Sequence, residues 1–212
     1  MAERPVYVPG KNSNSADVYM TSFIWNKGLA ISQKKKNITA LHDAFQQRFP
    51  DHKILEISSK SMQELGIKLS AFNLKKFVPE LNTSVPLECS FQGGKVFNAG
   101  GPYLDLYTAS PRDAKRDARL KNSGSLKNFY FNKETIPLTP KDAFYNWLYI
   151  NALLENPDLG DALMEYDAFT DIEFNPNKSI NCQAKAAAVY VGLAKRNLLN
   201  ECRDFHSFVS LL

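Results

Sequence analysis

The stretch LECSFQGGKVF, residues 87–97, holds a carboxylate, an amide and an amine among apolar residues, together with a glycine pair. Pro86 suits the first turn of a helix. At about 3.6 residues per turn, a helix over 87–97 places Glu88, Gln92 and Lys95 within about 60° of one another. The glycines cost such a helix roughly 1 kcal/mol each relative to alanine, so close approach of another backbone or a ligand explains them better. The segment predicts one wall of a polar site; a weak surface pair of charges is the alternative.

The composition is that of an ordinary globular protein. The chain has 212 residues, 44% hydrophobic and 23% charged, enough for one sizeable core. No apolar run reaches the roughly 18–20 residues of a membrane span, and the N-terminus lacks the apolar core of a signal peptide, so we expect a cytoplasmic protein without a membrane partner. Cys89, Cys182 and Cys202 cannot all pair with one another, which fits reduced thiols. We find no metal-ligand spacing, phosphate-binding loop or nucleophile elbow.

Apolar periodicity and capping residues predict a helix-rich α+β fold, predominantly α-helical. Ser110 and Thr139 each begin a capping box with a first-turn proline. The expected helices cover 32–49, 61–66, 87–97, the segments after Ser110 and Thr139, 158–166 and 180–199, the last capped by Ser179. The expected strands lie within 17–25 and 53–58, whereas 69–86 and 167–179 read as loops with extended pieces.

Basic residues are concentrated in two runs. Between Arg112 and Lys127 there are six bases and two acids, an excess of four that equals the net charge of +4 for the whole chain. The second run is Lys34, Lys35 and Lys36. A solvated helix face explains either run alone, but such patches also suit a polyanion such as nucleic acid.

An acidic cluster lies near the C-terminal third of the chain. In YDAFTDIEF, residues 166–174, three acids and Thr170 alternate with aromatic and aliphatic residues. Semi-apolar surroundings raise the pKa of a carboxyl, so Asp167, Asp171 and Glu173 are candidates for chemistry. An exposed loop is the alternative.

Several segments, read in order, resemble the NADAR family, also called YbiA-like proteins. The family has an L-S-N-F loop, a V-E-H-x-x-Q-x-x-K helix, an S-P-x-x-A-K segment, a helix ending in N-P-x-L and an acidic loop before a helix with an early asparagine. The corresponding segments are LSAFNL at 69–74, LECSFQGGK at 87–95, SPRDAK at 110–115, LLENPDL at 153–159 and YDAFTDIEFNPNKSINCQA at 166–184. Ala71 replaces the family's asparagine, and Cys89 replaces its histidine.

The N-terminal part is similar to one subfamily, the NADAR antitoxins associated with guanine-modifying DarT toxins. The similar segments are YVPG at 7–10, ISQKKKNITALH at 31–42 and ILEISSKS at 54–61. The resemblance implies a NADAR-like catalytic domain at 61–212, with residues 1–60 as an extension packed on it.

The resemblance implies a hydrolase that removes ADP-ribose from guanine in DNA and so reverses a DarT-type toxin, with neither metal nor cofactor. Cleavage at the anomeric carbon passes through an oxocarbenium-like state and needs a proton donor. Glu88 is the first candidate for this carboxyl. Lys95 either attacks the anomeric carbon or orients the ribose hydroxyls. Asp167 or Asp171 positions water or binds ribose.

The remaining expected contacts follow from the same resemblance. Phe72 and Phe91 stack on a base or pack in the core. The expected polar contacts to ADP-ribose are Ser70, Gln92, Thr170 and Asn181. The expected DNA contacts, weakened by salt, are Arg112, Lys115, Arg116 and Arg119.

The expected partners are ADP-ribosylated DNA with its guanine unpaired or flipped out, ADP-ribose as product, and a cognate DarT-type toxin. Three alternatives remain: a non-catalytic ADP-ribose-binding module, an antitoxin that grips its toxin, and an N-glycosidase acting on a free nucleotide.

Overall fold

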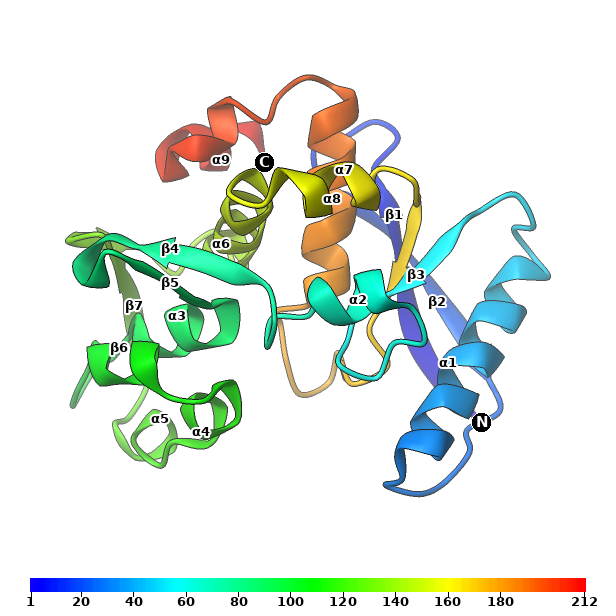
Figure 1. Ribbon diagram of the computed structural model, residues 1–212, viewed down its shortest axis with the longest axis horizontal. Helices are drawn as coiled ribbons and strands as arrows, with labels where there is room; N and C mark the ends of the chain where they lie inside the picture. Colours follow the sequence, from blue (N-terminus) through cyan, green and yellow to red (C-terminus); the bar gives the residue numbers. More distant parts are fainter.

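The largest sheet joins distant parts of the chain. In the computed structural model, which describes residues 1–212, its strand order is β2-β1-β9-β3 (Figure 1). The hairpin of β1 (Ala2–Pro9) and β2 (Ala16–Phe23) is antiparallel, and β3 (Ile54–Glu56) pairs in parallel with β9 (Ala168–Thr170). Both predicted strand segments are thus confirmed, and the first 60 residues share a sheet with a strand from the acidic segment.

Helix α1 (Ile31–Gln46) covers a small core beside this sheet, where its Ile38, Leu41 and Phe45 are fully buried. The main core also reaches into the first 60 residues and includes Leu55. The boundary at residue 60 therefore does not separate two independent cores.

The centre of the molecule is helical. Helices α6 (Ala143–Leu154) and α8 (Gln183–Lys195) pack together in the main core, and buried alanines of α8 permit close approach. Both begin later than predicted. Asp142, in a left-handed conformation, precedes α6, and its carboxylate binds the Lys185 ammonium at 2.6 Å instead of capping the helix.

Ser179 does not cap α8, because the chain is still non-helical there and the N-cap residue is Cys182. The capping box at Ser110 is confirmed, since its hydroxyl accepts a hydrogen bond from the Asp113 amide at the start of α4 (Pro111–Arg116).

The prediction of one helix over residues 87–97 is wrong. Helix α3 (Leu87–Gly93) ends at the glycine pair, and Lys95 begins strand β6 (Lys95–Phe97). A Cβ on Gly93 would lie 2.5 Å from the Tyr107 ring, and one on Gly94 would lie 2.6 Å from the Tyr130 carbonyl. Close approach of neighbouring segments therefore explains both glycines, as predicted.

The remaining elements surround these two cores. Helices account for 42% of the residues, so the α+β class is confirmed although helices form less than half of the chain. None of the helices combines the length and the apolar character that crossing a membrane requires. The remaining bounds are α2 (Glu64–Lys68), β4 (Lys75–Val78), η1 (Pro79–Leu81), β5 (Thr83–Pro86), η2 (Leu104–Thr108), α5 (Arg119–Asn122), β7 (Leu126–Phe131), β8 (Glu134–Ile136), α7 (Pro157–Leu163), η3 (Glu201–Arg203) and α9 (Phe205–Leu211).

Candidate active site

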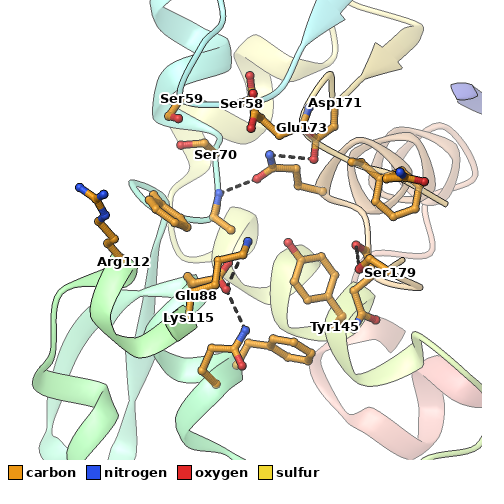
Figure 2. Close-up of a pocket in the computed structure, with 18 of the residues that line it drawn as sticks. Ser58, Ser59, Ser70, Glu88, Arg112, Lys115, Tyr145, Asp171, Glu173 and Ser179 are labelled. Atoms are coloured by element: carbon orange, nitrogen blue, oxygen red, sulfur yellow. Dashed lines mark hydrogen bonds and ion pairs between the residues drawn. The ribbon is translucent and has the colours of Figure 1, made fainter. Parts of the chain in front are cut away.

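A cleft of about 910 Å³ lies between the α3–α4 region and the loops that follow β3 and β9 (Figure 2). It is at the upper end of the size range of ligand pockets. Only six of its 23 lining residues are hydrophobic, and bases outnumber acids. The bases are Lys60, Lys95, Arg112, Lys115, Arg116 and Lys178, and the acids are Glu88, Asp171 and Glu173. This excess of positive charge suits an anionic ligand.

Glu88 is a buried carboxylate on the wall of the cleft. It is only 5% exposed, and the Gln92 side-chain amide donates a hydrogen bond to its Oε1 at 2.8 Å. The Lys115 ammonium, on α4, is 3.6 Å from the same oxygen. The i,i+4 spacing in α3 brings the carboxylate and the amide together, as predicted. Glu88 is thereby fixed in one orientation at the cleft surface.

Lys95 reaches the same cleft from a strand. Its ammonium lies 4.7 Å from the centre of the Phe91 ring. Burial, reinforced by the charge of Lys115 and partly opposed by Glu88, lowers the pKa of Lys95 to about 8. An amine with such a pKa is partly unprotonated near neutral pH and is therefore available as a nucleophile.

Asp171 stands on the opposite side of the cleft, at the end of β9. The Gln183 side-chain amide donates to its carboxylate at 3.0 Å and to the Ile57 carbonyl at 2.7 Å. The Gln183 oxygen accepts a hydrogen bond from the Ala71 amide at 2.7 Å. One glutamine therefore fixes the acid relative to two loops of the cleft wall.

A second buried carboxyl, Glu56, lies behind Asp171. It accepts hydrogen bonds from the Ser58 hydroxyl at 2.7 Å, the Thr170 hydroxyl at 2.6 Å and the Ile172 amide at 2.9 Å. Burial raises the pKa of Glu56, and burial together with Glu56 raises the pKa of Asp171 well above its usual range. Because two like charges in one buried site repel, the pair retains a proton at a pH where exposed carboxyls have lost theirs.

This arrangement agrees with the comparison to protein families. A family model described as DarT1-associated NADAR antitoxin matches residues 2–212. The chain belongs to this family. Membership confirms the resemblance drawn from the sequence motifs, and an antitoxin of this family implies a cognate DarT-type toxin as partner. No protein of curated function is significantly similar to the chain in sequence.

The NADAR cleft excludes two residues that the sequence placed in the site. The Asp167 carboxylate accepts a hydrogen bond from the Lys53 amide at 2.9 Å and lies 3.2 Å from His52, outside the cleft. Thr170 is fully buried in β9, where it contacts Glu56 and His42. Period-two alternation turns the neighbouring side chains of Thr170 and Asp171 to opposite faces. Asp167 precedes β9 and lies outside the cleft because its carboxylate is bound to the Lys53 amide.

Of the four basic residues predicted to contact DNA, only some lie at the cleft of this NADAR antitoxin. Arg112, Lys115 and Arg116, all on α4, line the cleft. Arg119 does not, because its guanidinium is held by Asp105 at 2.6 Å and by Asp117 at 2.9 Å. Arg119 therefore organises the turn between α4 and α5 and does not face a ligand.

The other predicted contacts all line the NADAR cleft: Ser70, Phe72, Phe91, Gln92 and Asn181. Phe91 also packs edge-to-face on Tyr145, with ring centres 5.0 Å apart, so it serves both core and cleft. Phe72 lies under the Lys115 ammonium, which is 5.4 Å from its ring centre.

Tyr145 is a cleft residue that the sequence analysis missed. It lies on α6, is 6% exposed and lines the cleft. Figure 2 shows this hydroxyl pointing into the cleft between Glu88 and Asp171. A tyrosine inside a helix that is apolar on all sides is a usable signal, because a buried phenol normally finds a partner.

Proposed function

We propose that this NADAR antitoxin is an N-glycosidase that hydrolyses ADP-ribose from guanine in DNA and so reverses a DarT-type toxin. NADAR proteins have glycosidase-type activity. The observation that carries the proposal is the convergence of Glu88, Lys95 and Asp171 in one cleft with an excess of basic residues. Acid, base and nucleophile functions are then available around one bound sugar.

The charge of the cleft suits ADP-ribose. The pyrophosphate carries two negative charges, and basic side chains from three separate segments surround the cavity, among them Lys60, Lys115 and Lys178. Tyr145 and Ser70 lie where hydroxyl groups of a ribose find hydrogen-bonding partners. Phe72 offers an aromatic face at the side of the cleft nearest α4.

The reaction breaks the bond between the anomeric carbon and the exocyclic nitrogen of guanine. Asp171, which retains its proton, donates it to the departing guanine, and the bonding electron pair leaves with the base. The Glu88 carboxylate stabilises the positive charge that develops on the ribose and accepts a proton from the attacking water. The products are unmodified guanine in DNA and free ADP-ribose.

Lys95 takes part in one of two ways. In the first, its neutral amine attacks the anomeric carbon and displaces guanine, which leaves with the bonding electron pair. The amine loses a proton, and water then hydrolyses the adduct. In the second, the amine orients the ribose hydroxyls while water attacks directly. Borohydride reduction during turnover, followed by mass spectrometry, separates these routes, because only an open-chain imine formed from the adduct is trapped on Lys95.

The test of the function is release of ADP-ribose from a DNA oligonucleotide that carries ADP-ribosyl-guanine. Glu88→Gln removes the charge and keeps the size of the side chain, and we expect at least a 100-fold slower release, within the usual contribution of acid–base groups. Glu173→Gln is the matched control, since this exposed acid also lines the cleft. Full activity of Glu88→Gln would remove Glu88 from the chemistry.

Membership of an antitoxin family also supports a second candidate function, in which the protein neutralises its toxin by binding it. A Glu88→Gln, Lys95→Ala double variant distinguishes the two. Under the proposed function it fails to neutralise the toxin in cells. Neutralisation by this variant, together with co-purification of the toxin, would favour the binding mode.

A further inference from the structure

We propose that the DNA strand on either side of the modified guanine crosses the mouth of the cleft between two basic rims. The α4 rim is Arg112 and Arg116, and the α1 rim is Lys35 and Lys36. The proposal rests on the proposed function and specifies its substrate as an unpaired strand that extends beyond the modified nucleotide in both directions.

The start of α1 lies at the edge of the cleft. Leu29, two residues before α1, lines the cleft although its side chain is 95% exposed. Lys34, in the first turn, pairs at 3.1 Å with Glu173, which is also a lining residue. In Figure 1, the start of α1 lies at the lower right of the molecule, and α4 and α5 lie at the lower left. Leu29 and Lys34 therefore place the start of α1 at the edge of the cleft that α4 also lines.

Helix stability does not account for the lysines of α1. Lys34, Lys35 and Lys36 occupy its first two turns, where no acid accompanies them in the first turn. Cations near a helix N-terminus are unfavourable by about 0.3–1 kcal/mol each. Lys34 is engaged by Glu173 and by the Trp25 ring, 5.7 Å away, whereas Lys35 and Lys36 are exposed and form no ion pair.

The α4 rim has the same character. Arg112 and Arg116 form no ion pair, although Arg119 in the next helix is doubly paired. Four unpaired cations on two sides of one opening create a positive field that attracts a polyanion.

A single strand fits this arrangement better than ADP-ribose alone. Bases inside the cavity, such as Lys60 and Lys178, serve the ligand's two phosphates. The outer cations then match phosphates of the neighbouring nucleotides. Leu29 and Phe72 supply apolar surface at the opening, as in grooves that combine backbone charges with contacts to bases.

The experiment compares Lys35→Gln/Lys36→Gln with Lys127→Gln/Lys195→Gln. The control pair is also exposed, lies outside the cleft and changes the net charge equally. Binding of an unmodified single-stranded oligonucleotide is measured over a salt series. The slope of log K against log salt is negative. We expect its magnitude to fall by about 1.4 in the α1 variant, at about 0.7 for each lost phosphate contact, and to be unchanged in the control.

Turnover supplies a second readout. The ratio of kcat/KM for an ADP-ribosylated oligonucleotide to kcat/KM for ADP-ribosylated guanosine should fall several-fold in the α1 variant and remain at the wild-type value in the control. A wild-type salt slope in the α1 variant would overturn the proposal. If the wild-type protein hydrolyses neither substrate, the proposed function fails, whereas the binding slopes still test the rims.

Discussion

Replacing Lys95 by methionine is expected to stabilise the protein at neutral pH while abolishing turnover. Methionine keeps the length and the apolar contacts of the side chain but has no charge to desolvate. Burial lowers the Lys95 pKa from 10.5 to about 8. At about 1.36 kcal/mol per unit, the buried charge costs the folded state about 3 kcal/mol. Loss of the contact with the Phe91 ring offsets about 1 kcal/mol, which leaves a net gain of about 2 kcal/mol.

The sign of the pH dependence makes this prediction specific. Because the folded-state pKa lies below the unfolded value, the penalty is complete below pH 8 and disappears as the pH rises through 10.5. Urea unfolding should show Lys95→Met more stable than wild type at pH 7, with the difference declining towards pH 10.5. The exposed Lys127→Met serves as control and should change little. A less stable variant at pH 7, or a difference independent of pH, would refute the reasoning.

Three further substitutions test the cleft. Tyr145→Phe removes a hydroxyl that points into the cleft, so the free energy of unfolding should change by less than about 0.5 kcal/mol, while kcat/KM for ADP-ribose release falls. Gln183→Ala removes three hydrogen bonds, including those to Ala71 and Ile57, and should lower the free energy of unfolding in urea by about 2–4 kcal/mol. Asp167→Asn should release ADP-ribose at the wild-type rate, because this carboxylate lies outside the cleft; a large loss would show that the cleft extends to it.

Local spacing was enough to predict the pairing of Glu88 and Gln92. Both lie on one short helix, where an i,i+4 pair is determined by helical geometry alone. Lys95 was predicted to join them for a reason that is wrong, since the helix ends before it. It nevertheless lines the cleft, because β6 begins directly after α3 and the glycine pair leaves room for the neighbouring Tyr107 and Tyr130 segments.

The roles of Glu56 and Gln183 could not be predicted from local sequence patterns. Glu56 meets Thr170 through the parallel pairing of β3 and β9, between residues 114 positions apart. Nothing in a strand's own sequence states which distant strand it will join. The same pairing decides that Asp171 faces the cleft while Thr170 is buried, so the acidic cluster could be recognised from the sequence but not divided correctly.

Lys95 and Asp171 line the cleft, and neither forms an ion pair. Outside the cleft, the Lys185 ammonium binds Asp142 at 2.6 Å, so a partly buried cation has an anion of its own. Inside it, burial moves the pKa of Lys95 down and that of Asp171 up, so that both shift towards neutrality. Such groups destabilise the fold, yet they exchange protons most readily at physiological pH. Lys95 and Asp171 therefore lower the stability of the fold and supply reactive groups to the cleft. For this reason, a neutral side chain at residue 95 should raise the free energy of unfolding and abolish the reaction.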